Sequence, residues 1–482
     1  MHLQFGVNPN NLENGPSLET TNRIMVQLRR VILLIIDERS MVSNQLLDAV
    51  ERHSTQLVHG GGNSSLLFGG IPVILLFGDD MQIPPVFSNG QGLGAFHALS
   101  TENIPIHEGH KSKSEYRGRE LFRKLSNNVM EITYRRRQDG DETTMKILDD
   151  LETGCPSEET VKFLLNLNIR RLSPSKMQHM KKNSIFIFAT HNEKNEHNCM
   201  QLAQLCSEEN PLLCLKYKNA SHNSKSAIIR HFNTRLTPLA TQFCVGCKVA
   251  LKRNFQPQWG LYNGAIGTVQ EIIYKQDCNP NFGHFPEYIA VDFPSFSPPD
   301  NVTPFDKEHP QVVPIPMAFQ MCKYRCCKII VCPLVVAFGR TIHSFQGQEA
   351  GPGKAIPSII VSPGSKSFES NNIGTLNTCV SRVTTLGGKN SDSALYFTGP
   401  YITHDRFRDL TLKANGEKLK KIILRDKWVH YLSEQCRITR EKFHDIDLHL
   451  VHNIFQNIDN MKISYPNLDD VVSQHLQQPG MK

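Results

Sequence analysis

The sequence lacks the features of a membrane protein and of a secreted one. No apolar run approaches the ~20 residues that a helix needs to cross a bilayer, and no basic stretch followed by an apolar one begins the chain. There is no internal repeat, and 13 cysteines in 482 residues do not suggest a disulfide framework. We therefore expect an intracellular protein with no membrane partner.

The chain also has little excess of positive over negative charge. The chain has 53 Lys and Arg residues against 46 Asp and Glu residues, a net charge of +7. This small excess permits a phosphate-backbone partner without requiring one. With 39% hydrophobic residues, a chain of 482 residues can form two or three domains with well-buried cores.

The cysteine pattern does not favour a metal site. Six cysteines are close enough in sequence to be assembled into a zinc site on paper: Cys244, Cys247, Cys322, Cys326, Cys327 and Cys332. Their spacing is irregular, however, and the residues after Cys244 alternate as a strand does. We expect them to be small buried hydrophobic residues in the core.

An aliphatic stretch, Val31 to Met41 (V-I-L-L-I-I-D-E-R-S-M), is the clearest feature that is present. The run predicts a strand of a parallel sheet that is buried on both faces, and it ends at Asp37 and Glu38. Ligands of open α/β sheets bind beyond the carboxyl ends of the strands, so these carboxylates are placed to work on a ligand. The alternative is that Asp-Glu merely begins a helix, where acidic residues suit the helix dipole.

A second strand of the same design favours the ligand interpretation. Gly70 to Pro85 is again an apolar run that stops at a glycine and a carboxylate, Gly78 and Asp79, followed by Gln82. Between the two strands, Ser43 to His53 has apolar residues at helical spacing. The sequence therefore predicts a β-α-β unit with both strands in one parallel sheet.

These two stretches resemble known motifs. I-I-D-E-R-S-M resembles the Walker-B element of superfamily 1 helicases, and F-G-D-D-M-Q-I-P-P-V resembles their motif III. The pair is similar to the PIF-type 5′-to-3′ DNA helicases and to the helicase part of Helitron transposons. The resemblance implies an α/β fold of two RecA-like P-loop NTPase domains with parallel sheets, the second of which carries an SH3-like β-barrel insertion.

The resemblance and the change of pattern along the chain set the expected domain limits. Short strands separated by turn signals, including Asn263-Gly264, follow Cys244 and predict the insertion. The limits are 1–136 for the first RecA-like domain, 137–242 and 331–400 for the two parts of the second, 243–330 for the SH3-like insertion, and 401–482 for a helical or disordered tail.

Arginines and a glutamine in later motifs are the expected nucleotide contacts. T-Y-R aligns Arg135 with an arginine that touches the γ-phosphate in the family, although a run of arginines is also typical of a solvated basic face. S-R-V places Arg382 as a second arginine finger, with an exposed helix arginine as the alternative. T-I-H-S-F-Q-G resembles motif V and assigns Gln346 and Gly347 to nucleotide. Phe345 stands where the family usually has Ser.

The same resemblance assigns contacts to DNA. Thr190 and His191, in A-T-H-N, fall where the family contacts the DNA backbone, and Thr341 and His343 form the DNA end of the motif V-like turn. Two aromatic residues, Trp259 and Tyr262, can stack on bases. The alternative for both is that they pack in the core of the barrel.

The 482 residues contain no phosphate loop of the form G-x-x-G-x-G-K-[ST]. Such a loop wraps the phosphates with backbone N–H groups and supplies a lysine and a magnesium-binding hydroxyl. The nearest string, around Lys354, follows no strand and ends in Ala355. We therefore expect that the chain is truncated before this loop and that, as given, it is inactive as an ATP hydrolase.

Two functions remain open. The first is an ATP-driven DNA helicase that translocates on single-stranded DNA and unwinds duplex, in replication, repair, recombination or telomere maintenance. In it Asp37 binds Mg²⁺, Glu38 orients the attacking water, Gln82 senses the γ-phosphate, and the two arginines complete the charge clamp. The second is an inactive DNA-binding remnant of a helicase or Helitron. We expect ATP and Mg²⁺ as cofactors, single-stranded DNA and DNA junctions as partners, a monomer without a protein partner, and a nuclear location with the mitochondrion as alternative.

Overall fold

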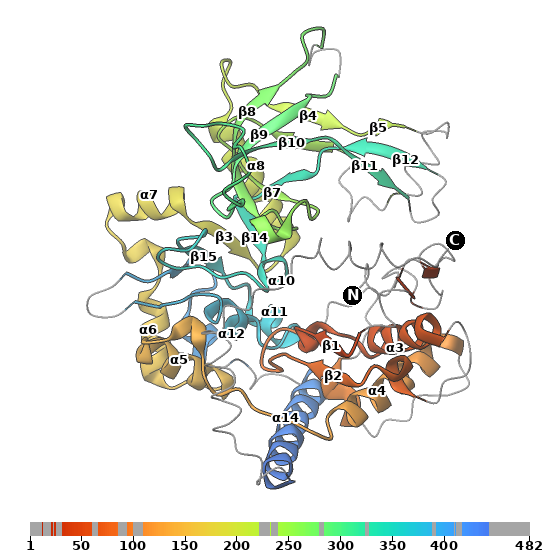
Figure 1. The fold of residues 1–482 in the computed structure, drawn as a ribbon. Helices are drawn as coiled ribbons and strands as arrows, with labels where there is room; N and C mark the ends of the chain where they lie inside the picture. The colour runs from red at the N-terminus through yellow and green to blue at the C-terminus, as the bar shows by residue number, and fades with distance from the viewer. Residues whose placement is uncertain are drawn as a thin grey trace, which may run out of the picture.

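A computed structural model of the chain describes residues 12, 21, 22, 24, 25, 31–59, 66–84, 94–99, 109–220, 232, 240–278, 284–322, 327–387, 392–408, 410 and 417–442. The described helices include none that is long and apolar enough to span a bilayer. Figure 1 shows two α/β units, with a region of antiparallel strands above one of them.

The first unit contains the predicted β-α-β arrangement. Strands β1 (Leu33–Ile36) and β2 (Val73–Leu76) are parallel, with Leu33 opposite Val73, and helix α3 (Asn44–His59) connects them. The helix extends beyond the predicted end at His53. Asp37 and Asp79 follow the two strands and lie at the same edge of this pair.

The prediction that these strands are buried on both faces is wrong. Side chains at Leu34 and Ile36 pack with α3 and α4 (Gly109–Leu125), whereas Leu33 and Ile35 on the opposite face are exposed. Val73 of β2 is exposed in the same way. Aliphatic composition alone does not reveal which face a helix covers, because every position of the run is apolar.

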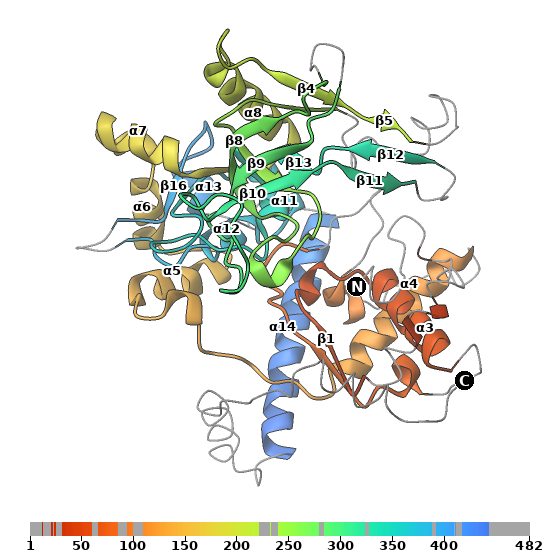
Figure 2. The same ribbon diagram turned by 45° about the horizontal axis from the view of Figure 1, so that its top comes forward.

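The tail contributes a helix to the first unit. Helix α14 (Glu417–Lys442) lies beside this unit in both views (Figures 1 and 2), and its Trp428 and Leu432 belong to the same hydrophobic core as Leu47 and Phe122. The predicted helical tail is therefore present up to Lys442, and it packs as part of a domain. The remainder of the predicted tail, 443–482, lies outside the described residues.

The second unit is a parallel sheet with helices around it. The strand order is β14-β3-β15-β16, and every neighbouring pair is parallel. Its elements are α5 (Glu142–Glu152), α6 (Glu158–Asn166), α7 (Pro174–Asn183), β3 (Ile185–Phe188), α8 (His191–Leu205), β14 (Gly339–Thr341), α10 (Ile342–Phe345), β15 (Ile359–Ser362), α11 (Lys366–Asn371), α12 (Thr375–Val380), β16 (Leu395–Phe397) and α13 (His404–Arg408).

The region between α8 and β14 is antiparallel throughout the described strands. One sheet has the order β10-β9-β8-β7-β13, a second has the order β11-β12-β5, and β4 pairs with β6. The strands are β4 (Leu213–Lys216), β5 (Lys218–Asn219), β6 (Ala240–Phe243), β7 (Lys248–Leu251), β8 (Ile266–Ile273), β9 (Tyr288–Asp292), β10 (Val312–Pro316), β11 (Ala318–Met321), β12 (Lys328–Val331) and β13 (Leu334–Val336).

This antiparallel region is wider than the predicted insertion at 243–330. Strands β4 and β5 and most of β6 precede the predicted start, and β13 follows the predicted end. Strands β5 and β13 nevertheless pair with strands of the predicted insertion, and β4 pairs with β6. Its core contains the buried thiols of Cys244, Cys247 and Cys332, as predicted for core cysteines. Burial raises the pKa of Cys247 and of Cys332 to about 12, which keeps both thiols protonated.

Candidate nucleotide site and nucleic-acid interface

The turn after β1 carries the two predicted carboxylates, and only Glu38 is partly buried. Asp37 is exposed, and its Oδ1 accepts a hydrogen bond of 2.8 Å from the backbone N–H of Glu38. Glu38 has φ 53° and ψ 50°, the left-handed conformation that side-chain-bearing residues rarely adopt. Such strain persists where surrounding contacts fix the backbone and is common at functional sites.

The loop after β2 is packed tightly against that turn. The backbone N–H of Arg39 donates to the Phe77 carbonyl over 2.7 Å. A Cβ at Gly78 would lie 2.7 Å from the same nitrogen, so only glycine fits there. Asp79 accepts from the Met81 N–H over 2.8 Å and from the side-chain amide of Gln82 over 3.1 Å, and these contacts orient Gln82.

Residues of the second unit reach these side chains. Arg382 donates from Nη2 to Gln82 Oε1 over 2.9 Å, and its Nη1 lies 4.0 Å from Glu38 Oε1. Gln346 donates from its side-chain amide to the other oxygen of Glu38 over 3.2 Å. The structure therefore brings Glu38, Gln82, Gln346 and Arg382 together at the junction of the two units, and Gly347 directly follows Gln346.

The electrostatics of this cluster suit an anionic ligand. Arg382 is 4% exposed. Burial lowers its pKa, as does the nearby positive charge of Arg137, while Glu38 and Asp79 oppose both effects. Arg382 Nε and Gln346 Oε1 are buried and have no hydrogen-bond partner among the residues that the structure describes. A phosphate oxygen is a suitable acceptor for the unpartnered guanidinium N–H.

Helix α12 ends two residues before Arg382, and its side chains bind backbone groups of the loop after β2. The Ile83 N–H donates to Thr378 Oγ1 over 3.0 Å, and both residues are fully buried. The side-chain amide of Asn377 donates to the Met81 carbonyl over 3.4 Å. A Cβ at Gly374 would lie 2.3 Å from that carbonyl, which explains a glycine at this left-handed position.

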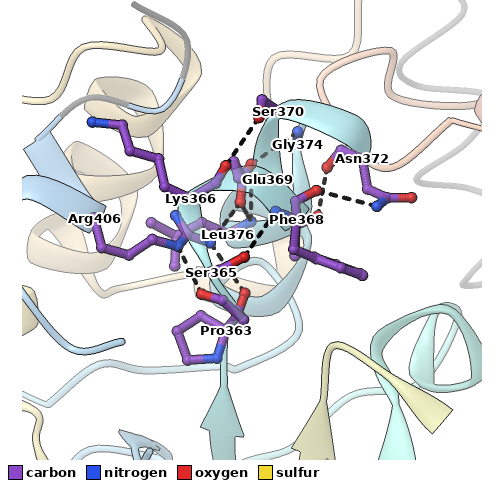
Figure 3. A network of polar contacts seen from close by, with 12 residues as sticks. Pro363, Ser365, Lys366, Phe368, Glu369, Ser370, Asn372, Gly374, Leu376 and Arg406 are labelled. Carbon is purple, nitrogen blue, oxygen red and sulfur yellow. Dashed lines mark hydrogen bonds and ion pairs between the residues drawn. The ribbon is translucent and has the colours of Figure 1, made fainter. Parts of the chain in front are cut away.

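A buried ion pair supports the start of α12 (Figure 3). Glu369 and Arg406 are each 2% exposed at the side chain, and Arg406 Nη2 lies 2.9 Å from Glu369 Oε2. Glu369 also accepts from the backbone N–H groups of Gly374 and Leu376 over 3.1 and 3.2 Å. The carboxylate therefore links α11, α12 and α13 and orders the loop that faces Met81.

The structure places the other predicted arginine away from this cluster. Arg135 lies 2.7 Å from Asp149 and 2.9 Å from Glu152, two carboxylates of α5. Burial raises the pKa of Glu152 to about 7, and Asp79 adds to the rise while Arg135 opposes it. Arg135 thus lies near the junction without contacting Gln82, and its phosphate role stays a prediction.

Sequence reasoning missed the contact of Arg137, two residues further along the chain. Its Nη1 donates to the Ser381 carbonyl over 2.8 Å, beside Arg382, and its Nε lies 3.5 Å from a Glu349 oxygen. The arginine run contains no signal that tells Arg137 from Arg135.

Sequence reasoning also missed a link from the tail to the site. Asp80 accepts from Arg39 Nη2 over 2.6 Å and from the indole N–H of Trp428 over 3.1 Å. Arg39 follows Glu38 directly, and Trp428 on α14 is 1% exposed. The available signal was a tryptophan, one of two in the chain, within a stretch rich in Lys and Arg.

The predicted DNA contacts lie at one sheet edge. Strands β3 and β14 are parallel with Thr341 opposite Phe188, so Thr341 at the end of β14 and Thr190, two residues after β3, lie at the same edge. Thr190 caps α8 by accepting from the Glu193 N–H over 3.3 Å. Burial lowers the pKa of His343, and the charge of His191 adds to the effect.

Further cations surround that edge. Burial lowers the pKa of Lys194, and the charges of Lys252 and Arg340 contribute. Arg340 donates to the Gly264 carbonyl over 2.9 Å and thereby connects the second unit to the Asn-Gly turn of the antiparallel region. Tyr262 in this turn is 38% exposed. Trp259 is half-buried nearby.

The residues present can hold a magnesium nucleotide only in part. Asp37 offers an exposed carboxylate directly before Glu38, whose side chain lies 4.0 Å from Arg382, and a carboxylate near a guanidinium fits a metal ion with phosphate ligands. Within the described ranges no group of three or more His, Cys, Asp or Glu side chains is arranged to hold a metal by itself. Any Mg²⁺ here would therefore share its coordination with phosphate and water.

Comparisons with known proteins agree with this geometry. Residues 1–104 match the family model of PIF1-like helicases. A search of curated proteins finds no match. Among solved structures, Pif1 helicase from Candida albicans is 19% identical with a TM-score of 0.57, and the match covers 89% of this chain and 84% of that one.

Two further structures have similar scores. Bacteroides Pif1 bound to single-stranded DNA is 20% identical with a TM-score of 0.53, covering 90% of this chain and 83% of that one. A Pif1 structure that addresses DNA unwinding at forked double-stranded DNA by two coordinating Pif1 helicases is 19% identical with a TM-score of 0.54, and the match covers the same shares of the two chains. The match of residues 1–104 and the fold shared over most of the length confirm the predicted resemblance to the PIF1-like helicases and the predicted RecA-like α/β fold class.

Proposed function

We propose that this chain is the motor part of an ATP-dependent DNA helicase, with nucleotide bound at the junction of the two RecA-like units. The observation that carries the proposal is the contact of Arg382 from the second unit with Gln82 and Glu38 from the first. Closure of such a junction on ATP places positive charge beside the γ-phosphate and couples hydrolysis to movement of one unit against the other.

The chain's own residues have distinct roles in this proposal. Water attacks the γ-phosphorus, the bond to the ADP oxygen breaks, and Glu38 orients the water and accepts its proton. Gln82 senses the γ-phosphate, and the Arg382 guanidinium stabilises the charge that develops on it. In the structure Gln346 and Arg382 both face Glu38, so a phosphate would compete with Glu38 for Arg382.

Asp37 and the remaining predicted residues complete the proposal. Asp37 would hold Mg²⁺, which supplies charge neutralisation at the phosphates. Arg135 and Gly347 remain proposed nucleotide contacts, and Arg135 would first have to leave Asp149 and Glu152. Thr190, His191, Thr341 and His343 remain proposed contacts to single-stranded DNA.

Two of the similar structures support DNA as the proposed partner. One is Bacteroides Pif1 bound to single-stranded DNA, and another concerns DNA unwinding at forked double-stranded DNA by two coordinating Pif1 helicases. We propose single-stranded DNA and DNA junctions as partners, a monomeric motor, and roles in replication, repair, recombination or telomere maintenance, in the nucleus or the mitochondrion.

A second candidate is a DNA-binding remnant of a helicase or Helitron. One observation favours it: the 482 residues contain no phosphate loop with the G-x-x-G-x-G-K-[ST] pattern. Without that loop the junction retains Glu38 and Arg382 but has few groups to hold the α- and β-phosphates. Such a chain would bind DNA and turn over ATP poorly or not at all.

A DNA-stimulated ATPase assay on residues 1–482 separates the two candidates. Turnover in the ordinary enzymatic range, ~1–10³ s⁻¹, would establish the motor and refute the remnant. Absence of turnover with retained DNA binding would support the remnant for these residues. A chimaera given the phosphate loop of a related helicase then tests the motor residues, because Glu38→Gln should abolish its turnover and leave nucleotide binding nearly intact.

Arg382→Ala in the same chimaera should reduce turnover by about 10³-fold or more, as loss of an arginine finger does. Both variants must unfold at the temperature of their parent. Near-normal turnover of Glu38→Gln would show that the Asp-Glu pair is a structural helix start rather than a catalytic element.

A further inference from the structure

A small sheet in the antiparallel region has one face that no described element covers. It consists of β11, β12 and β5, and it projects from the larger sheet in both views (Figures 1 and 2). Phe319 and Met321 on β11 are 57% and 49% exposed. Large apolar side chains that are this exposed, at neighbouring positions of one face, indicate an interaction site.

Strand register identifies the residues of this face. Directly opposed residues of an antiparallel pair lie on the same face, and Phe319 is opposite Ile330 while Met321 is opposite Lys328. Lys218 of β5 is in turn opposite Ile330. Phe319, Met321, Ile330, Lys328 and Lys218 therefore form one surface, here called the β11–β12 face.

The other face of the sheet has its own core. Ile329, which alternates with the exposed positions, is fully buried and packs with Phe232, Cys322 and Cys327. The exposed face is therefore not needed to fold the sheet, because the opposite side chains already bury an apolar cluster.

The charge of the β11–β12 face is positive. Neither Lys218 nor Lys328 forms an ion pair with a carboxylate of the described residues, and the five residues of the face include no acid. Lys328 Nζ instead lies 3.9 Å from the centre of the Phe319 ring. An exposed cation–π contact is worth only about 0.5–1 kcal/mol, so the ammonium can move to a stronger anionic partner.

We propose that the β11–β12 face binds unpaired bases of single-stranded DNA outside the junction of the two RecA-like units. A base stacks on the Phe319 ring, with Met321 and Ile330 at its edges, and the two lysines contact the flanking phosphates. An aromatic ring that shares a face with two lysines, neither paired with a carboxylate of the described residues, fits a ligand that is both flat and anionic. The inference rests on the proposed function, because that function supplies single-stranded DNA as the partner.

The test uses the full chain of 482 residues and a fluorescein-labelled oligo(dT). Phe319→Ala should weaken binding by about fivefold or more, the low end of what loss of one base–aromatic stack costs, with no change in the salt slope. Lys328→Ala should flatten the slope of log K against log salt by about 0.7, the value for one phosphate contact on a single strand. Tyr116→Ala on α4 is the control for an exposed aromatic, and Lys427→Ala on α14 is the control for an exposed lysine.

Photo-crosslinking of the wild-type chain with 5-iododeoxyuridine oligonucleotides locates the base without any substitution. Adducts on Phe319 or Met321 support the proposal. Wild-type binding with adducts only elsewhere and a Phe319→Ala effect within twofold overturns it and leaves the proposed function intact. Absence of any binding by the wild type overturns both. Self-association that Phe319→Ala abolishes, without adducts on this face, assigns the face to a second copy of the chain and also overturns the proposal.

Discussion

Arg382 donates a hydrogen bond of 2.9 Å to the side-chain oxygen of Gln82, a residue 300 positions earlier in the chain. The two residues belong to different α/β units, and each has a second contact that fixes it: Gln82 with Asp79, and Arg382 with Ser381. Because this contact joins the two units, substitutions of residues at the junction should change the stability of the folded chain, and that change can be measured.

Thr378→Val should lower the free energy of unfolding by about 1–3 kcal/mol. The substitution preserves shape but removes the oxygen that accepts from the Ile83 N–H, and it leaves that buried donor unpaired. Urea denaturation followed by circular dichroism measures the loss, with Thr133→Val at an exposed position as control. Equal stability of the variant and the wild type would show that the Ile83–Thr378 contact does not hold the two units together.

Glu369→Gln should destabilise the second unit by about 3–5 kcal/mol, because it leaves Arg406 as a buried charge without its counter-ion. Asp405→Asn is the matched control. Asp405 also pairs with a lysine, Lys366, at 3.2 Å, but its side chain is 70% exposed, and its loss should cost about 0–1 kcal/mol. Similar effects of the two substitutions would contradict the structural role of the buried pair.

Trp428→Phe should destabilise the first unit by about 1.5–3 kcal/mol, the value of a hydrogen bond to a charged group, because Asp80 loses the indole N–H. Limited proteolysis should then cleave within residues 31–84 at lower protease concentrations. Trp259→Phe, the same change in the antiparallel region, is the control. Unchanged proteolysis of the first unit would mean that α14 does not support the loop of Asp80.

The stability difference between Glu152→Gln and the wild type should depend on pH. The folded-state pKa of Glu152 is about 7, above its ordinary value of 4.5, so folding takes up a proton between these pH values. The contribution of the protonated Glu152 carboxyl to the free energy of unfolding is complete below about pH 4.5 and is lost as the pH rises through 7. The melting temperature of Glu152→Gln minus that of the wild type should therefore increase from pH 5 to pH 8.

Glu159→Gln on α6, an exposed carboxyl, is the control for that measurement. A difference that stays constant or falls with pH would mean that Glu152 does not retain a proton at the junction.

Much of the site was predictable because strand ends can be read from local sequence. The apolar runs that end at Asp37 and Asp79 predict two neighbouring parallel strands, and parallel strands bring their carboxyl ends to one edge. The resemblance then assigned Gln346 and Arg382 to the nucleotide. In the structure they contact Glu38 and Gln82, and their roles toward a nucleotide stay a prediction.

Other parts were not predictable, since they depend on contacts between distant segments. Nothing local distinguishes Arg137 from Arg135, and only the packing of α12 against the loop shows which arginine lies beside Ser381. The partner of Asp80 is Trp428, which lies 348 residues away. The exposed face of β1 was missed because all of its residues are aliphatic, so the sequence has no alternation that marks an uncovered side.

The position of α14 also determines when the first unit can fold during synthesis. Its core includes Leu47 and Phe122 from the early part of the chain, and it is completed by Trp428 and Leu432. At about 5–20 residues per second, the ribosome needs roughly 15–60 s to proceed from Phe122 to Leu432. During that interval the second unit can fold. The apolar surface around Leu47 remains uncovered until α14 has been synthesised, and chaperones can bind it.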